Sequence, residues 1–266
     1  ARPGKRSGAW MNTYRAHSTY DGDENVLGSN NNNFVKAPDG DPVLISLDDA
    51  ETLFHEFGHA LHQMLSDVTY EAISGTSVPR DFVELPSQLY EHWLEVPEVL
   101  QKFAVHAETG KPMPQDMLER LLNAATFDMG FSTVEYVASA LVDLEFHDGA
   151  PPKDAMTKQA DVLDSIGMPA AIEMRHRTPQ FAHVFSGGYY AASYYSYMWS
   201  EVMDADAFEA FEEAGGAFDP DMAALLEEHI LSKGGCVDPA DLYIAFRGRL
   251  PDVGALLKGR GLDTAA

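Results

Sequence analysis

Residues 55–62 read His-Glu-Phe-Gly-His-Ala-Leu-His, and this stretch decides how the chain has to fold. Positions four apart lie one above the other on the same face of an α-helix, so the imidazoles of His55 and His59 can converge on one point. Glu56 is turned away from that point and is better placed to hold a water beside a metal than to bind the metal itself. The spacing therefore predicts a helix that carries two metal ligands and a general base.

The same helix does not complete a metal site. The metzincin form of the motif requires glycine at position 62 and histidine at position 65, whereas this chain has His62 and Leu65. A ligand at His62 would crowd the metal from one side, so we expect His62 to have a structural or supporting role. Catalytic zinc commonly takes two histidines and a glutamate. Candidates for that glutamate follow in the next helical segment, and spacing alone does not choose among Glu84, Glu91 and Glu95.

The composition is that of a globular, acidic protein. Of the 266 residues, 45% are hydrophobic and 11% aromatic, which is ample for a buried core. The formal net charge of -24 argues against a nucleic-acid surface and against an anionic membrane as partners. No apolar stretch is long enough to predict a transmembrane helix. The single cysteine, Cys236, cannot form an intrachain disulfide, which fits a reducing, cytoplasmic location.

Hydrophobic periodicity predicts a mainly helical chain with little sheet. Residues 1–42 are rich in Gly, Pro, Asn and Asp and are expected to be loop-dominated. Residues 43–46 are expected to form a short strand whose open edge could pair with an extended peptide. Further helices are predicted over residues 79–94, with Pro86 either bending the helix or lying within its first turns, and over 117–146, 153–166, 190–211, 221–231 and 239–250.

The motif helix is expected to run from about residue 48 to residue 66. Ser46 or Asp48 would serve as its N-cap, with Glu51, three residues after Asp48, as the partner in a capping box.

Three longer segments resemble the thimet oligopeptidase and peptidyl-dipeptidase family of zinc metallopeptidases. They are HEFGHALHQ (55–63), SGTSVPRDFVELPSQ (74–88) and HVFSGGYYAASYYSYMW (183–199), in the same order as in the family. The resemblance implies one helical catalytic domain over residues 1–266, a gluzincin-like zincin with a small β element beside the motif helix. Its parts would be a loop-rich lead-in (1–42), the metal-binding helices (43–110) and a helical subdomain with the glycine and tyrosine segment (111–266).

The resemblance also implies the metal site. In that family the glutamate of the FVE-x-PSQ segment is the third zinc ligand, and here it matches Glu84. One zinc ion per chain would be held by His55, His59 and Glu84, with Glu56 as the general base.

The third segment implies the substrate contacts. Family members have a histidine before a glycine pair, matched by His183, and tyrosines after it. This chain holds one residue more than usual there, so alignment on the glycines selects Tyr189 and alignment on the YYSY end selects Tyr190. We prefer Tyr190, because it shares a helical face with the tyrosines four and seven residues later. The implied catalytic residues are His183, Tyr190 and Tyr197, and the implied substrate-binding residues are Gly187, Gly188, Tyr189 and Tyr194.

The implied function is a zinc-dependent endopeptidase or oligopeptidase that cleaves peptides or unfolded polypeptides with a water activated by Glu56. One alternative is a peptidyl-dipeptidase that releases C-terminal dipeptides, and another is an inert peptide-binding helical domain, against which the intact Glu56 argues. Family members are longer, and an N-terminal helical region encloses their active site. If the chain is complete, the site is expected to be more open and longer peptides to be cut. If the chain is a fragment, an exposed apolar surface is expected where the missing region packs, together with weak activity.

Overall fold

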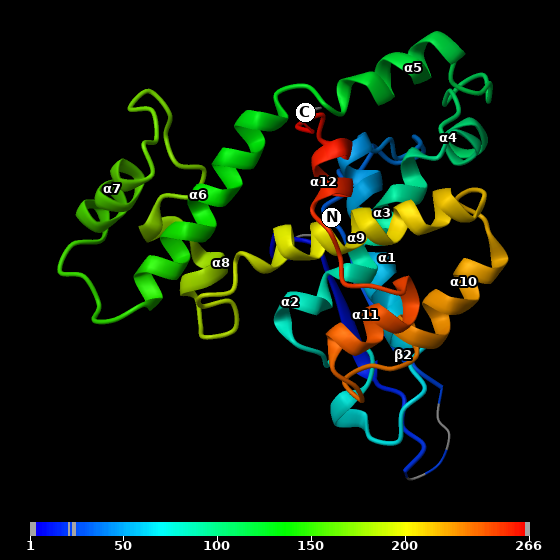
Figure 1. Cartoon of the computed structure of the whole chain (residues 1–266). Coiled ribbons are helices and arrows are strands. Elements are labelled where there is room, and N and C mark those ends of the chain that lie inside the picture. Colours follow the sequence, from blue (N-terminus) through cyan, green and yellow to red (C-terminus); the bar gives the residue numbers. More distant parts are fainter. Residues whose placement is uncertain (1–3, 21, 23–24, 264–266) are drawn as a thin grey trace.

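The computed structural model describes residues 4–20, 22 and 25–263, and in them it shows a mainly helical fold with a single two-stranded sheet (Figure 1). Helices α1, α3 and α9 form the centre of the larger group of elements, and α6, α7 and α8 form a second group to one side of it (Figure 1). This confirms the predicted fold class. No helix in the described ranges has the length and apolar character needed to cross a bilayer.

The elements follow one another along the chain in this order. The strands are β1 (Trp10–Arg15) and β2 (Leu27–Asn31). The first helices are α1 (Leu47–Met64), η1 (Glu71–Ile73), α2 (Arg80–Val83), α3 (Leu85–Glu95), α4 (Pro97–Phe103), α5 (Gln115–Ala124) and α6 (Met129–His147). The later ones are α7 (Ala155–Ser165), η2 (Thr178–Gln180), α8 (Ala182–Phe185), α9 (Ser196–Ala214), α10 (Pro220–Leu226), the π-helix η3 (Glu227–Leu231), α11 (Pro239–Arg247) and α12 (Gly254–Gly259).

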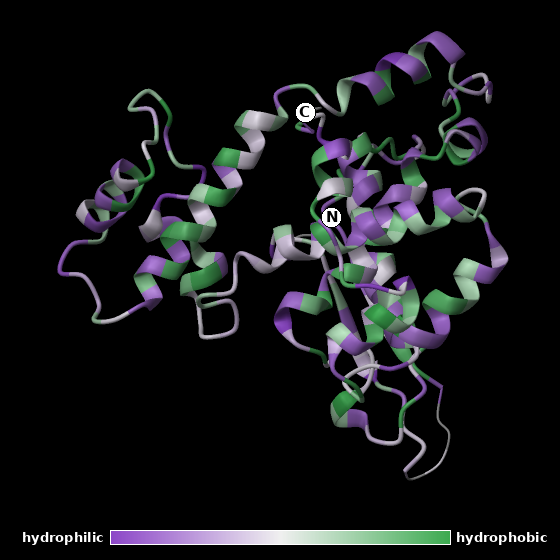
Figure 2. Ribbon diagram, viewed as in Figure 1, coloured by the Kyte–Doolittle hydropathy of each residue, from purple (hydrophilic) through white to green (hydrophobic). Residues whose placement is uncertain are grey.

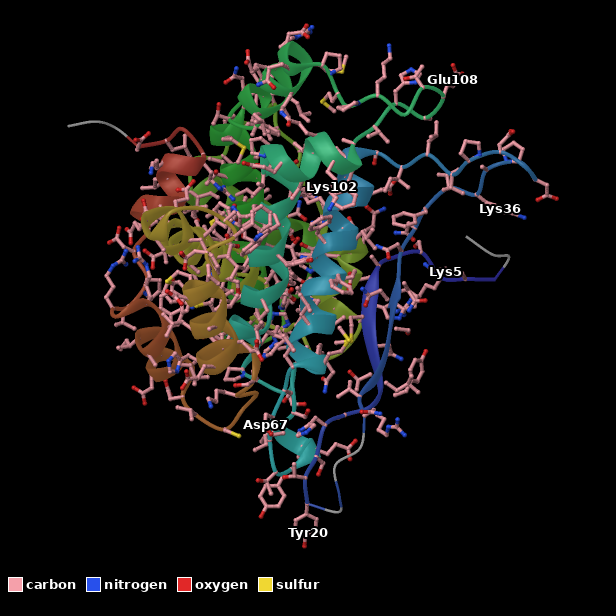
Figure 3. All side chains as sticks on the ribbon, turned by 90° about the vertical axis from the view of Figure 1, so that its right-hand side faces the viewer. Lys5, Tyr20, Lys36, Asp67, Lys102 and Glu108 are labelled. Carbon is pink, nitrogen blue, oxygen red and sulfur yellow. The ribbon has the colours of Figure 1, made fainter. Side chains whose placement is uncertain are left out.

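The sheet lies in a different place from the predicted strand. β1 and β2 pair antiparallel, with Trp10 opposite Asn31, and they run alongside α1 (Figure 3). The strand predicted over residues 43–46 is wrong: that segment has no regular structure, and Leu44 is 68% exposed. An apolar run becomes a strand only where a neighbouring strand pairs with its backbone, and here the two paired segments are the polar ones of the lead-in.

The start of α1 is fixed by a capping box at Ser46. The Ser46 hydroxyl accepts a hydrogen bond from the Asp49 N–H at 3.0 Å, and the Asp49 carboxylate accepts one from the Ser46 N–H at 3.1 Å. The predicted alternative with Asp48 as cap and Glu51 as partner is therefore wrong. Both aspartates of the first turn, Asp48 and Asp49, are favourable beside the helix N-terminus.

Several predicted helices are divided or shortened. The helix predicted over 79–94 is two helices, α2 and α3, and Pro86 lies in the first turn of α3. The one predicted over 117–146 is divided into α5 and α6 by a turn in which Asp128 has φ 56°. The helix predicted from Tyr190 begins only at Ser196, so Tyr190 and Tyr194 lie in a loop and share no helical face with Tyr197.

Each of the two groups of elements has its own hydrophobic cluster. The first lies between α3, α9, η3 and α11 and is centred on the fully buried side chains of Phe82, Leu89, Phe211, Ile230 and Tyr243. The second lies between α6, α7 and the segment before α9 and contains Val142, Val162, Phe181, Val184 and Tyr194. Apolar and polar residues alternate along most of the helices (Figure 2), as expected for helices with one buried face.

Gly58 lets α1 and α3 approach each other closely. A Cβ placed on Gly58 would lie 2.6 Å from the carbonyl oxygen of Pro86 and 2.6 Å from the Cα of Ser87. Both contacts are with backbone atoms, which cannot turn aside as a side chain can. The absence of a side chain at Gly58 therefore lets α3 pack closely against α1, the helix that carries the histidine motif.

We predict that Gly58→Ala destabilises the protein, although alanine favours a helix, because it pushes α3 away from α1. The expected loss in the free energy of unfolding is about 1–3 kcal/mol, the usual cost of overpacking, measured by urea denaturation. Gly130→Ala in α6 is the matched control, because a Cβ there meets no atom within 4 Å, and we expect it to be neutral or to stabilise by up to about 1 kcal/mol. Equal effects of the two substitutions would contradict the close contact at Gly58.

Candidate active site

Two neighbouring helices bring three ligand atoms together. His55 and His59 lie one turn apart on α1, and Glu84, at the junction of α2 and α3, reaches both. Its Oε2 lies 3.3 Å from the Nε2 of His55 and 3.1 Å from the Nε2 of His59. The three ligand atoms all lie within 4.8 Å of one another. Two imidazole nitrogens and one carboxylate oxygen are a donor set that suits catalytic zinc, so these residues fit a zinc ion.

Glu84 is the buried member of this cluster, and its charge is balanced by the two histidines. The Glu84 side chain is only 4% exposed. Burial opposes its ionisation, but hydrogen bonds with His55 and His59 outweigh burial and hold the pKa of Glu84 below its usual range. Burial likewise opposes the charged form of His55, yet its hydrogen bonds with Glu84 and Glu91 raise its pKa to about 10. The site thus favours positive charge between the three side chains, as a cation site must.

Glu91 occupies the other side of the His55 ring. Its Oε1 lies 2.5 Å from the Nδ1 of His55, and it stands two turns beyond Glu84 along α3. A carboxylate at Nδ1 fixes the ring orientation and leaves Nε2 for the metal. Of the three glutamates considered as third ligand, Glu84 is the one beside both Nε2 atoms, Glu91 supports His55 from behind, and Glu95 is exposed.

His62 takes no part in this cluster. Its side chain is fully buried, and within the described part of the chain neither ring nitrogen has a hydrogen-bond partner. Burial lowers its pKa to about 3, so the imidazole is neutral. His62 is therefore a core residue of α1, as the argument from crowding indicates.

Glu56 lies next to the cluster with one oxygen free. The residue is 5% exposed, and its Oε2 has no hydrogen-bond partner among the described residues. Burial raises the pKa of Glu56, while the charges of His55 and His59 and a hydrogen bond with the Met11 backbone act in the opposite direction. A carboxylate whose pKa is raised by its surroundings, with a free oxygen beside a cation site, is suited to accept a proton.

A cavity of about 290 Å³ opens over the three ligands and Glu56. Residues from β1, α2, α8 and α9 and from the segment between the last two complete its wall, among them Trp10, Arg80, His183 and Tyr197. His183 Nε2 lies 3.0 Å from the hydroxyl of Tyr197. Burial lowers the pKa of His183, so its ring is neutral at pH 7 and can share a proton with this hydroxyl.

The tyrosines of the segment before α9 have different surroundings. Tyr190 lines the cavity, packs against His183 with 4.4 Å between ring centroids, and lies parallel to Tyr197. Tyr189 also lines the cavity but is 70% exposed. Tyr194 is only 9% exposed and packs in the second hydrophobic cluster against Phe181, so it does not line the cavity.

The two glycines of this segment do not line the cavity either. A Cβ added to Gly187 or Gly188 would have no other atom within 4 Å, so there is open space beside both glycines.

A buried carboxylate from α6 holds this segment in place. Asp143 is fully buried and accepts hydrogen bonds from the backbone N–H of Ala192 at 3.0 Å and of Tyr194 at 2.9 Å. His147 Nδ1, one turn further along α6, lies 2.9 Å from the same carboxylate. Ala192 has φ 55°, a left-handed conformation that costs energy for a residue with a Cβ. Asp143 therefore offsets the strain of a turn that places Tyr190 and Tyr197 on the cavity.

Sequence reasoning missed three residues of this site. Glu91 is visible in the sequence only as one of three possible ligands, and its contact with His55 needs the packing of α3 on α1. Arg80 stands one helical turn before Glu84, and its place in the cavity wall follows from that spacing. Asp143 carries no local signal, because the backbone groups that it binds are 49 and 51 residues away.

We predict that Asp143→Asn loosens the segment around residues 186–195 while the rest of the fold is kept. An amide can accept fewer of the three hydrogen bonds and faces a backbone donor with its own NH₂ group, which typically costs about 1–3 kcal/mol when the group is buried. Hydrogen exchange of peptides covering 186–198 should therefore quicken by about 10-fold or more. Asp164→Asn, at an exposed position of α7, is the control. Unchanged exchange in Asp143→Asn would contradict the role of this carboxylate.

The chain is similar to known proteins over nearly its whole length. Residues 1–262 match the model of peptidase family M3. The chain is 38% identical over 268 residues to the dipeptidyl carboxypeptidase of Salmonella typhimurium, an alignment that covers 99% of this chain and 39% of that protein. It is 37% identical over 271 residues to the oligopeptidase A of Escherichia coli, covering 98% of this chain and 39% of that protein. The chain thus spans about two fifths of the length of these relatives. The match over nearly its whole length shows that this chain belongs to peptidase family M3.

Proposed function

We propose that this chain is a zinc-dependent peptidase of the oligopeptidase type, which hydrolyses bonds within peptides or unfolded polypeptides. The observation that carries the proposal is the buried carboxylate of Glu56, one oxygen of which has no hydrogen-bond partner among the described residues, beside the cluster of His55, His59 and Glu84. A domain that only binds peptides has no need of a base at that position. A relative named oligopeptidase A supports this proposal, and a relative named dipeptidyl carboxypeptidase supports the alternative, release of C-terminal dipeptides.

In the proposed reaction, His55, His59 and Glu84 would hold the zinc ion. When bound, zinc polarises a peptide carbonyl and lowers the pKa of a bound water to about 7. Glu56 accepts the proton of the attacking water and passes it to the nitrogen of the leaving peptide, and its raised pKa suits both transfers.

The oxyanion that forms at the carbonyl needs hydrogen-bond donors. The hydroxyls of Tyr190 and Tyr197 and the ring of His183 lie in the wall of the same cavity. Burial raises the pKa of both tyrosines, so their hydroxyls keep their protons at neutral pH. Tyr190 packs on His183 inside the cavity wall, which supports Tyr190 over the exposed Tyr189 as the catalytic residue.

The substrate backbone is proposed to lie along β1. Within the described ranges, β1 pairs with β2 on one side only, and Trp10 and Met11 line the cavity. The open edge of a strand offers main-chain N–H and C=O groups to an extended peptide. The sequence analysis expected the open strand edge at residues 43–45, and the proposal now assigns it to β1.

The domain division and the location of the protein remain proposals. We propose a single catalytic domain over residues 1–266, with the lead-in, the metal-binding helices and the later helical part as its sections. A cytoplasmic location, proposed from the single cysteine, agrees with a relative named probable cytosolic oligopeptidase A, from Arabidopsis thaliana.

We predict that the protein binds one zinc ion and that Glu84→Gln weakens binding most strongly among the glutamates of this region. Glu91→Gln should weaken it by about 10- to 100-fold, the usual effect of losing a carboxylate behind a ligating histidine. The measurement is a competition titration against a chromogenic chelator. Glu95→Gln is the control, because Glu95 is exposed on the same helix and lies outside the ligand cluster. An equal effect of all three substitutions would argue against the proposed ligand set.

We predict that Glu56→Gln lowers hydrolysis of an internally quenched peptide by about 100- to 10,000-fold, the range expected for loss of a general base. Zinc affinity should be unchanged, because Glu56 is not a proposed ligand. Removal of the metal with a chelator should abolish the activity of the unmodified protein, and added zinc should restore it. Mass spectrometry of the products separates internal cleavage from release of C-terminal dipeptides. Activity that survives in Glu56→Gln would exclude this residue as the base.

A further inference from the structure

Two consecutive residues of α2 contact the tyrosine segment, which we define as residues 186–195. The guanidinium of Arg80 lies over the ring of Tyr189, with 3.5 Å from Cζ to the ring centroid. Asp81, the next residue, accepts a hydrogen bond from the hydroxyl of Tyr195 at 3.1 Å. The short helix α2 therefore holds this segment at two points, one on each side of the turn that lies between the two tyrosines.

The first half of the tyrosine segment has little support from its own backbone. A Cβ added at either glycine of the pair 187–188 would have no other atom within 4 Å. The hydrogen bonds from the backbone to Asp143 begin only at Ala192. The stack on Arg80 therefore ties the first half of the segment to the helices that carry the proposed metal ligands.

Arg80 is available for stacking, because no ion pair joins it to a carboxylate in the part of the chain that the structure describes. Other arginines of this acidic chain are paired with acids, among them Arg177 with Glu173. A guanidinium is planar and packs its face against an aromatic ring, where the charge is attracted to the π-electrons. Arg80 is also partly buried, and partial desolvation strengthens such a contact.

Tyr190 is held by its neighbours on two sides. Its ring centroid lies 4.7 Å from the Cζ of Arg80 and 4.4 Å from the centroid of the His183 ring. It lines the cavity, nearly parallel to Tyr197. Because Tyr190 follows Tyr189 directly in the chain, a movement of Tyr189 away from α2 would carry Tyr190 with it.

We propose that Arg80 is a positioning residue, which stacks on Tyr189 and so anchors the tyrosine segment to α2 with the hydroxyl of Tyr190 facing the cavity. The proposal rests on the proposed peptidase function and deepens it, because Arg80 acts on the reaction through Tyr190 without touching the substrate. A donor stabilises an oxyanion best when it is oriented before the reaction begins. The two consecutive tyrosines thus have different roles: Tyr189 holds the segment, and Tyr190 donates the hydrogen bond.

The kinetic test uses an internally quenched peptide and zinc-loaded protein. We expect Arg80→Gln to lower kcat by about 10- to 100-fold, less than the loss of about 100- to 1,000-fold expected for Tyr190→Phe, which lacks the donor altogether. KM should change by less than about 2-fold, because the affected interaction forms only in the transition state. In the Tyr190→Phe background, Arg80→Gln should have little further effect on kcat, because the donor that it positions is already absent.

Background variants separate stacking from other effects. Arg80→Gln should lower kcat as strongly in Tyr189→Phe, which keeps the ring, but should have little further effect in Tyr189→Ala, which lacks it. Arg177→Gln, which removes an exposed arginine outside the cavity, should leave kcat unchanged. A rise in KM at unchanged kcat would show that Arg80 binds the substrate itself and would overturn the proposal. Factors that simply multiply in Arg80→Gln, Tyr190→Phe would also overturn it.

A second measurement does not depend on peptidase activity. Chymotrypsin is added to zinc-loaded Glu56→Gln, and cleavage after Tyr189 or Tyr190 is followed by mass spectrometry. Cleavage there requires the segment to leave the cavity wall, so its rate reports how often the anchor opens. Adding Arg80→Gln should raise this rate by about 2- to 30-fold, the range for loss of a cation–π contact. Adding Arg177→Gln should not. An unchanged rate with Arg80→Gln overturns the anchor.

The two measurements together separate this proposal from the proposed function. Faster chymotryptic cleavage with Arg80→Gln, without hydrolysis of the quenched peptide by the unmodified protein, would support the anchor and count against the peptidase activity. Hydrolysis by Arg80→Gln at the rate of the unmodified protein would support the peptidase activity and overturn the role of Arg80.

Discussion

The close contact between α1 and α3 is the constraint on which the active-site geometry depends. At Gly58 the backbones of the two helices approach so closely that even a methyl group would meet the carbonyl of Pro86. On one side of this contact α1 carries His55 and His59, and on the other the chain carries Glu84 and Glu91. Because both elements are rigid and tightly packed, the carboxylates are held at the imidazole nitrogens without help from a flexible loop.

The opposite wall of the cavity is formed by a loop segment instead of by two packed helices. The segment before α9 is not helical where it meets the cavity, and it contains Ala192 in a left-handed conformation. Its backbone is held by Asp143, a buried carboxylate from α6 that belongs to the second group of elements. The proposed metal ligands thus come from the larger group of helices, whereas the tyrosines before α9 are positioned by the smaller one. A site that draws on both groups is sensitive to how they are arranged relative to each other.

Charge is distributed unevenly around the cavity. The chain as a whole is strongly acidic, and Glu56 and Glu84 bring further negative groups to the cavity itself. The histidines of α1 balance Glu84, and Arg80 adds a positive group that is stacked on tyrosine rings instead of being paired with an acid. Such an arrangement suits a cation at the three proposed ligands, because the acidic chain as a whole also attracts positive charge.

The sequence alone was sufficient for the parts of the site that lie within one or two turns of helix. The pair His55 and His59 with Glu56 follows from helical periodicity, and the family resemblance, carried by three continuous segments, is confirmed over residues 1–262. The mainly helical fold was predictable for the same reason, because helices are made by contacts between residues close in the sequence.

The tertiary structure decided what depends on residues far apart. The strand lies at β1 because a partner was available there, and the apolar residues at 43–45 remained without one. Tyr190, Tyr194 and Tyr197 do not share a helical face, because Asp143 on another helix holds their backbone in a loop. Hydrophobic periodicity predicts which side chains would lie on one face of a helix. A hydrogen bond between residues about 50 positions apart produces no periodic pattern in the sequence, so it cannot be predicted in this way. Only the folded chain shows that bond.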